Sequence, residues 1–411
     1  MYAPRTEANY PVEHFINREL SLLQFQRRVL AQAADTTVPL LERLRFLCIV
    51  SSNLDEFFEI RVSGIKEQIR SRSQKAGIDG IAPVDLLERV SDEVHEIIAE
   101  QYSLLNEDIL PALENEGVVF LRRSLWTEAQ HAWVRDYFMR EMMPVLTPIG
   151  LDPVHPFPRV LNKSLNFAVE LEGRDAFGRD SRAAIVQAPR ALPRVIRLPR
   201  ELCEQEYTFV FLSSVLHAHV SELFNGMNVL GCYQFRVTRN SDLFVDEEEV
   251  KDLRASLKGE LQQRAFGAAV RLEVADNCSE EMANFLLQHF HLDADDRTPG
   301  IVNLVRLMQV PDWVHRPHLN YEPFVPGLPK ALQKRRQIFA AIRSQDILLH
   351  HPFQSFAPVI DLLRTAADEM MAVHGGTVLP LACDVRDPDA VDAMVAALRG
   401  ETAGLTTLTG E

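Results

Sequence analysis

Ser51-Ser52-Asn53-Leu54-Asp55-Glu56-Phe57-Phe58 stands between two runs of apolar residues in helical spacing. The upstream run begins at Pro39, a residue tolerated in the first turn of a helix because its missing N–H would have no partner there. The downstream run extends from Asp55 to Ile69. We therefore expect residues 51–53 to break the helical run and a new helix to open at Asp55.

The polar residues of this stretch allow two interpretations. A helix start presents free N–H groups and the positive end of the helix dipole, and an Asn carboxamide can both donate to and accept from a purine edge. Asn53 would then contact an anionic or nucleotide ligand. Alternatively, Ser52 caps the helix and Asn53 only fills its first turn, where such residues are common.

The neighbouring residues extend the helical region to about residue 116. Ser21 and Gln24 fit a capping box, in which a hydroxyl and an amide satisfy free backbone amides at a helix start. A long amphipathic helix is expected over roughly residues 84–113. The pattern predicts an all-α N-terminal domain over residues 1–116.

From Gly117 the pattern becomes that of an α+β domain, which we expect to extend to residue 310. Residues 118–121 are typical of a strand, and Thr127 with Gln130 three residues later predicts a capped helix. Alternation over residues 165–171 predicts a half-buried strand. The further elements expected are a hairpin of residues 235–238 and 243–245 around a turn at 239–242, a helix over 247–263, a strand over 268–274 and a helix over 280–290.

Prolines then mark a boundary. Five prolines from Pro311 to Pro329 predict a connector without regular structure over residues 311–330. The residues that follow, 331–367, have the outline of the start of an α/β domain. Its expected elements are a helix over 338–343, a short buried strand over 346–349 and a helix over 356–371.

The composition limits the classes of function. The chain has 411 residues, and 43 Lys and Arg against 58 Asp and Glu give a formal net charge of −15. This acidic balance argues against a general nucleic-acid binder, although a local cluster of arginines can still dominate the field inside a cleft. We therefore expect no nucleic-acid partner.

Several familiar signatures are absent from the sequence. The five cysteines are scattered singly, which indicates reduced thiols and a cytoplasmic protein. No apolar run approaches the ~18–20 residues of a membrane helix, and no signal peptide is visible, so we expect no transmembrane segment. There is no phosphate loop of the G-x-x-x-x-G-K-[ST] type, and the histidines show no metal spacing, so we expect no metal ligands.

Polar and basic residues in two places are candidates for contact with an anion. One group follows a loop with four prolines over residues 146–159, and the other lies on an expected strand. The alternatives are a rigid structural loop and strand-edge arginines that are only solvated. The candidates are Arg159 at the end of the loop, Asn162 and Lys163 just after it, and Arg236 and Arg239 on the strand.

His350 and His351 follow the expected buried strand. Histidines at such a place can be ligands, bases or phosphate carriers. Neighbouring strand residues point to opposite faces, so we do not expect these two to serve one metal.

Several separated motifs follow one another in order along the chain. They are Phe15–Phe25, Arg43–Leu47, Ser52–Phe58, Leu146–Arg159, Phe235–Arg239, Val270–Val274, Arg316–Leu319, Phe339–Arg343 and His350–Phe356. Together they resemble the first type of bacterial polyphosphate kinases, from about residue 13 to Ala367. The resemblance implies a helical N-terminal domain, an α+β head domain and the start of the first of two phospholipase-D-like domains, in a protein that forms homo-oligomers.

This resemblance implies a function. The family transfers the terminal phosphate of ATP reversibly to inorganic polyphosphate through a phosphohistidine, with Mg²⁺ as cofactor. ATP, ADP and polyphosphate would be the partners, and the Asn that matches Asn53 contacts the adenine. The location would be cytoplasmic, or at a membrane as part of a complex.

The family's nucleophilic His, its metal- and phosphate-binding arginines and its second phospholipase-D-like domain all lie beyond the matching residues. We therefore expect no catalytic residue and no Mg²⁺ ligand in this chain, and no turnover by the chain alone. His350 and His351 would only shape the floor of the site. The rival hypothesis is a non-catalytic oligomerisation or regulatory module that binds polyphosphate.

Residues 368–411 resemble something else. Gly375 to Pro388 are similar to the third strand and following turn of short-chain dehydrogenases, in which a pair like Asp384-Val385 lies against the adenine of a dinucleotide. No G-x-x-x-G-x-G precedes this stretch and no Y-x-x-x-K follows it, which excludes a working dehydrogenase. We interpret these residues as an atypical tail joined to a kinase sequence by frameshift, recombination or misassembly.

Overall fold

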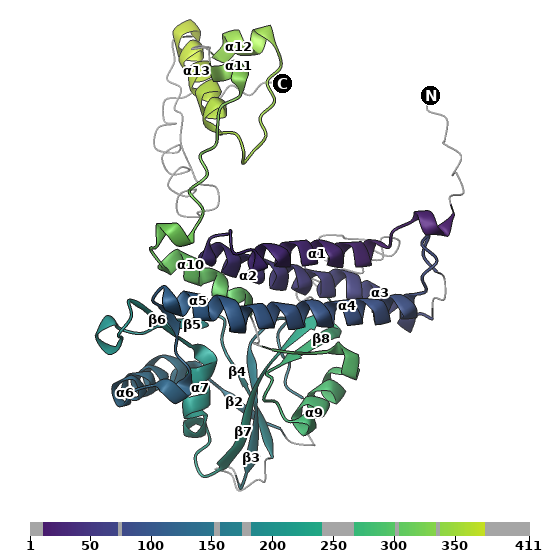
Figure 1. The fold of residues 1–411 in the computed structure, drawn as a ribbon, viewed down its shortest axis with the longest axis vertical. Helices are drawn as coiled ribbons and strands as arrows, with labels where there is room; N and C mark the ends of the chain where they lie inside the picture. The colour runs from purple at the N-terminus through teal and green to yellow at the C-terminus, as the bar shows by residue number, and fades with distance from the viewer. Residues whose placement is uncertain are drawn as a thin grey trace. The chain divides into compact units, whose positions relative to one another are not determined.

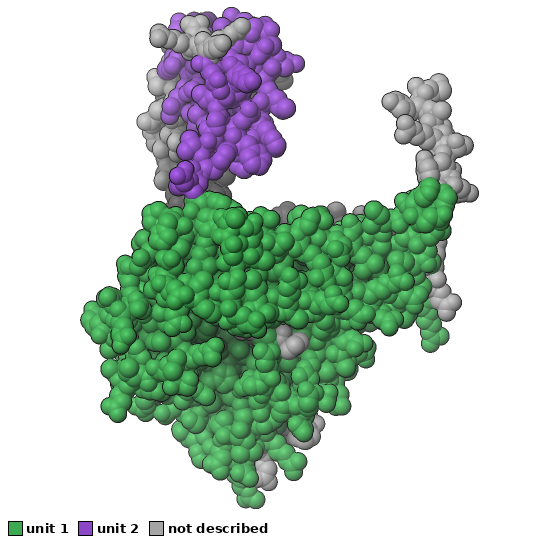
Figure 2. Space-filling view, viewed as in Figure 1, with its two compact units in different colours: residues 1–321 green, residues 322–411 purple. Residues whose placement is uncertain are grey.

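The structure, a computed structural model, falls into two compact units, residues 1–321 and 322–411 (Figure 2). The residues that the structure describes are 11–72, 76–151, 157–174, 182–240, 267–300, 304–333 and 338–374.

Helices form one layer of the first unit (Figure 1). Leucine, isoleucine and valine side chains spaced along these helices share one fully buried core, which includes Leu23, Leu44 and Ile97. The elements of the layer are η1 (Val12–His14), α1 (Arg18–Ala34), α2 (Leu40–Glu56), the π-helical turn η2 (Phe57–Val62), α3 (Ser63–Arg70), α4 (Pro83–Ser103), the π-helical turn η3 (Leu104–Ile109) and α5 (Leu110–Asn115).

The predicted break at residues 51–53 is wrong. These residues lie inside α2, and the chain stays helical through η2 and α3 to Arg70. The polar side chains are satisfied by other helices instead of by a cap, because Gln101 donates to Ser51 Oγ at 3.0 Å. The capping box predicted at Ser21 is also wrong, since α1 begins earlier and Asn17 caps it by accepting from the Leu20 amide.

A six-stranded sheet forms the other layer of this unit, in the order β2-β4-β3-β7-β8-β9. All neighbours pair antiparallel except β8 and β9, which are parallel. A smaller sheet has the order β1-β6-β5. The strands are β1 (Val118–Phe120), β2 (Pro148–Gly150), β3 (Asn166–Glu172), β4 (Ala183–Gln187), β5 (Val195–Arg197), β6 (Tyr207–Phe211), β7 (Asn228–Arg239), β8 (Ala269–Val274) and β9 (Arg297–Pro299).

Both faces of the larger sheet are covered along β3. Phe167 and Val169 belong to one buried cluster, and Ala168 belongs to another that includes α9 residues such as Leu286. Even Asn166 is fully buried. The alternation read from the sequence therefore assigns the faces correctly, but the expectation of a half-buried strand is wrong for residues 166–169 because helices pack against both sides.

The remaining elements of the first unit surround the two sheets. The capping box predicted at Thr127 is confirmed, since Thr127 Oγ1 accepts from the Gln130 amide and the Gln130 side chain accepts from the Thr127 amide. The elements are η4 (Arg123–Leu125), α6 (Glu128–Tyr137), η5 (Phe138–Met142), η6 (Met143–Val145), η7 (Arg200–Leu202), α7 (Leu212–His219), η8 (Val220–Leu223), α9 (Glu280–Phe290), η10 (Ala294–Asp296) and η11 (Leu304–Gln309).

The proline-rich stretch contains regular structure. Pro311 lies in the first turn of α10 (Val310–Trp313) and Pro317 in the first turn of η12 (Pro317–Leu319), where a missing N–H is tolerated. Val314 and Leu319 are buried in the core of the helical layer. The prediction that prolines prevent regular structure is therefore wrong for residues 311–313 and 317–319.

The second unit contains α11 (Lys330–Gln333), α12 (Ile338–Ser344) and α13 (Ala357–His374), and the last two confirm the helices predicted there. The buried strand predicted over residues 346–349 is wrong, because no strand forms there and Leu348 is 85% exposed. Among the described helices of the whole chain, none is long and apolar enough to span a membrane.

Some predictions fall outside the described residues. They concern part of the proline-rich loop, the turn and second strand of the hairpin, the helix expected after it, and most of the tail. The residues are 152–156, 241–263 and 375–411.

Candidate functional site

Asn53 lies in the last two turns of α2, not at a helix start. Its side-chain Nδ2 donates to Oε1 of Gln26 on α1 at 2.8 Å, and the side chain is half-buried. Both helix-start arguments therefore fail: Ser52 caps nothing, and no free amide group of a first turn lies beside Asn53. The contact of Asn53 with a nucleotide stays a prediction that rests on the family resemblance.

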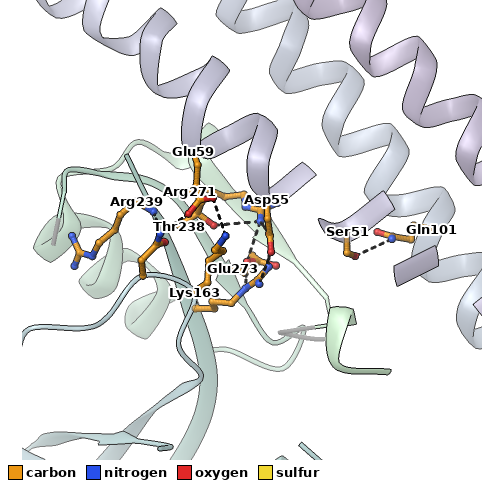
Figure 3. Close-up of polar contacts among 11 residues, drawn as sticks. Ser51, Asp55, Glu59, Gln101, Lys163, Thr238, Arg239, Arg271 and Glu273 are labelled. Atoms are coloured by element: carbon orange, nitrogen blue, oxygen red, sulfur yellow. Dashed lines mark hydrogen bonds and ion pairs between the residues drawn. The ribbon is translucent and has the colours of Figure 1, made fainter. Parts of the chain in front are cut away.

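Two residues further on, Asp55 joins the helical layer to the sheet (Figure 3). Arg236 of β7 donates to both of its carboxylate oxygens, at 2.9 Å and 2.8 Å, and Arg271 of β8 donates to one of them. Glu273 of β8 accepts from both arginines. We call Asp55, Arg236, Arg271 and Glu273 the ion cluster.

The ion cluster is buried and balanced, with two positive and two negative side chains. Burial opposes ionisation of Asp55, but the guanidinium groups of Arg236 and Arg271 outweigh it and hold the pKa of Asp55 below its usual range. Burial also opposes the charge of Arg236, but Asp55 and Glu273 raise its pKa. Arg271 additionally lies 4.4 Å from the centre of the Phe58 ring, a cation–π contact. Arg236 thus has two carboxylate partners inside the protein; its predicted contact with a ligand anion stays a prediction.

A second set of contacts is centred on Glu59 in η2. Lys163 Nζ lies 2.8 Å from one Glu59 oxygen, and Asn162 donates to the other. Asn162 also accepts from the backbone amide of Arg239 at 2.9 Å. Glu59 therefore anchors the loop that carries two of the predicted anion contacts and neutralises one of them.

Arg239 is directed away from the ion cluster (Figure 3). Its guanidinium donates to the backbone oxygens of Val160 at 3.0 Å and Gly267 at 2.8 Å. Burial lowers its pKa. It lines a cavity of about 380 Å³ together with Arg159.

We call this space the arginine cavity. It brings together Arg159 and Arg239, which were predicted, with three basic residues that were not. Arg70 ends α3, and His289 and His291 lie at the end of α9, so nothing local in the sequence connects them. The residues that line it are Arg70, Phe157, Pro158, Arg159, Arg239, Gly267, Ala268, Ala269, His289, Phe290 and His291.

The predicted histidine pair is exposed in the second unit. His351 Nδ1 lies 2.9 Å from the Gln354 backbone oxygen, and the His350 ring lies 5.1 Å from the Phe353 ring. No group of three or more His, Cys, Asp or Glu among the described residues is arranged to hold a metal ion.

Comparisons with known proteins agree on one family. Models of the N-terminal domain, the middle domain and C-terminal domain 1 of polyphosphate kinase match residues 15–121, 129–310 and 337–376. The last match continues past Ala367, where the resemblance read from the sequence was expected to end.

Curated relatives and a solved structure give the same result. A polyphosphate kinase of Pseudomonas syringae pv. tomato is 55% identical over 357 residues, 86% of this chain and 48% of the relative. One of Neisseria gonorrhoeae is 58% identical over 352 residues, 85% of this chain and 51% of the relative. The crystal structure of polyphosphate kinase from Porphyromonas gingivalis has a TM-score of 0.69 and 26% identity, over 88% of this chain and 50% of that one. The chain spans about half the length of the curated relatives it matches.

Proposed function

The chain belongs to the polyphosphate kinase family, and on that premise we propose that it serves the reversible transfer of the ATP terminal phosphate to inorganic polyphosphate through a phosphohistidine. The observation that carries this proposal is the ordered match of three polyphosphate kinase domain models along the chain. The chain spans about half the length of its relatives, so we propose the complete transfer reaction for the whole protein. For these 411 residues we propose one part of that function. We further propose that the protein works in the cytoplasm as a homo-oligomer.

The part proposed for the first unit is recognition of the nucleotide. Asn53 would hydrogen-bond the adenine, with its carboxamide oriented by Gln26. The ion cluster supports this role indirectly, because Asp55 ties the same end of α2 to the sheet through two arginines. The contact with Gln26 restricts the rotamers of Asn53, which favours a fixed hydrogen-bonding geometry over a mobile one.

The chemical step is proposed for a histidine outside the matching residues. A neutral imidazole is a competent nucleophile near neutral pH and divides one difficult phosphoryl transfer into two easier ones. Arginines at the transferring phosphoryl would stabilise its charge. No described residue of this chain is assigned to that step, so we propose that the 411-residue chain does not turn over ATP alone.

Titration with a fluorescent ATP analogue tests the nucleotide site. We expect Asn53→Ala to weaken binding about tenfold, which corresponds to the loss of one or two hydrogen bonds. Gln26→Ala should weaken it less, because Asn53 keeps its carboxamide. Asn115→Ala, at the exposed C-terminal end of α5, is the matched control and should not change the affinity. Equal affinity of Asn53→Ala and the unsubstituted protein would overturn the assignment.

Radiolabelled ATP tests the absence of turnover. We expect the purified 411-residue chain to form neither an acid-labile phosphohistidine nor a growing polyphosphate chain. Acid-stable chain growth that depends on this protein would refute the proposal that these residues are inactive alone.

One observation favours a second function, a non-catalytic module that binds polyphosphate and pairs with other copies. The arginine cavity offers basic groups to an anion, and binding there needs no catalytic residue. Autophosphorylation of the whole protein separates the two functions, because a kinase needs the phosphohistidine and a binding module does not.

A further inference from the structure

The arginine cavity concentrates positive charge in an acidic protein. Arg70, Arg159 and Arg239 line a volume of about 380 Å³, and none of the described residues that line it is an aspartate or glutamate. The whole chain carries a formal net charge of −15. Arg70 is partly neutralised by Glu67, whose carboxylate lies 3.7 Å from its guanidinium. An acidic protein repels a polyanion from most of its surface, but positive charge gathered in a hollow attracts it locally.

The described residues hold Arg239 in place without an ion pair. Its two hydrogen bonds go to the backbone oxygens of Val160 and Gly267, and its guanidinium lies 5.7 Å from the centre of the Phe290 ring. None of these partners has a net charge, and no carboxylate in the described part of the chain forms an ion pair with Arg239. Arg236, three residues earlier on the same strand, has two such partners. A fixed planar guanidinium with uncompensated charge suits the oxygens of a phosphate.

The aromatic residues of the cavity pack against one another. The His289 ring stacks on Phe157 with centroids 4.6 Å apart, and the Phe290 ring meets Phe157 edge-on at 5.3 Å. One face of Phe157 is thus already covered. Burial, with His291 nearby, lowers the pKa of His289, so this imidazole is neutral near pH 7 and offers hydrogen bonding without charge.

We propose that the arginine cavity binds a linear oligophosphate anion, at a place separate from the adenine contact proposed for Asn53. Its volume lies within the range of about 300–1,000 Å³ that is usual for small-molecule sites. The phosphate chain of ATP and inorganic oligophosphate share the required chemistry. Only the identity of the ligand as inorganic polyphosphate rests on the proposed function; the binding of oligophosphate does not.

Calorimetric titration of the 411-residue protein with tripolyphosphate tests this inference. Arg239→Gln should weaken binding about tenfold or more, since a charge-assisted bidentate contact is lost. Arg70→Gln, at a side chain that is 50% exposed, should weaken it several-fold. Arg140→Gln is the matched control, because Arg140 is a 63% exposed arginine at the end of another helix and does not line the cavity. Its affinity should equal that of the unsubstituted protein.

One further variant keeps the test decisive. Arg239→Lys retains the charge and loses the planar fork, so intermediate affinity is expected, and with Arg70→Gln it decides the outcome if Arg239→Gln does not fold. Tripolyphosphate affinity that is unchanged in both Arg70→Gln and the Arg239 variants would overturn the inference. The affinity should also depend less steeply on salt concentration in Arg70→Gln, because one contact with phosphate is lost. An unchanged salt dependence would contradict the inference.

Competition distinguishes the sources of phosphate and separates this inference from the proposed function. Displacement of tripolyphosphate by ATP, but only weakly by AMP, would support recognition of a phosphate chain, whereas equal displacement by adenosine would refute it. Asn53→Ala should leave tripolyphosphate binding unchanged. If Asn53→Ala also left ATP binding unchanged while Arg239→Gln still weakened tripolyphosphate binding, the adenine assignment would fail and the cavity would stand.

Discussion

Replacement of Asp55 by Asn would remove one negative charge from the buried ion cluster without changing the size of the side chain. The cluster would then hold Arg236 and Arg271 against Glu273 alone, so one guanidinium charge would be buried without compensation. Loss of one partner from a buried pair costs about 3–5 kcal/mol. All four residues are largely buried, and Asp55 is only 5% exposed, so solvent cannot reduce that cost by much.

Urea unfolding of Asp55→Asn measures this cost. We expect a lower urea midpoint, with nearly the same dependence of the unfolding free energy on urea concentration (the m-value). This corresponds to a loss of about 3–5 kcal/mol in the free energy of unfolding. The control is Glu222→Gln, the same carboxyl-to-amide change in an ion pair whose side chains are 58% and 35% exposed. Such a pair contributes about 0–1 kcal/mol, so the control should unfold close to the unsubstituted protein.

A double substitution makes the test specific for charge. Arg271→Met removes the second positive charge, so Asp55→Asn with Arg271→Met should lose less stability than the sum of the two single variants, by about 1–3 kcal/mol. Asp55 has a lowered pKa when folded, so its contribution exists above its unfolded pKa and is lost as pH falls through the folded value. A loss below about 1 kcal/mol for Asp55→Asn, or full additivity in the double variant, would refute this account of the cluster.

Three other substitutions test separate features. Burial, with Arg123 nearby, lowers the pKa of His217 to about 4. The unfolded state therefore binds a proton at a higher pH than the folded state does. The free energy of unfolding should fall as pH drops from about 6.5 to 4, by at most about 1.4 kcal/mol per pKa unit. His217→Asn should remove this slope from urea midpoints measured across that range, and an identical slope would contradict the assignment. Thr127→Ala should cost about 1 kcal/mol through loss of the capping box, and Thr127→Ser should restore it in thermal melts. Glu59→Gln keeps an acceptor for Asn162 and loses the ion pair with Lys163. It should lower the free energy of unfolding measured in urea by about 1 kcal/mol, and Glu59→Ala should lower it more.

Local features were predictable from the sequence, because their partners lie within a few residues. The capping box at Thr127 depends on positions three residues apart, and the helix over residues 280–290 carries its own apolar period. The family could also be recognised, since its motifs are short continuous stretches. For such features the local preference and the packing agree.

Features that depend on distant residues were missed. Arg236 and Arg271 lie 181 and 216 positions from Asp55 along the chain, so no spacing rule connects them. The helix predicted to break at residues 51–53 does not break, because Gln26 and Gln101 satisfy Asn53 and Ser51 across helices and the flanking leucines are buried. Weak local preferences yield to such tertiary contacts. The arginine cavity likewise joins residues from five separate stretches of the chain.

The wide turn η2 between α2 and α3 sets the rotational phase of the rod that contains both. A π-helical turn holds one residue more than the surrounding helix allows, and one residue in a regular α-helix corresponds to a rotation of about 100°. Deletion of a single residue from Phe57–Val62 would therefore leave Asn53 and Arg70 in nearly the same rotational relation, because the wide turn already absorbs that residue. A deletion inside the regular helix α3 would instead turn Arg70 by about 100° and away from the arginine cavity.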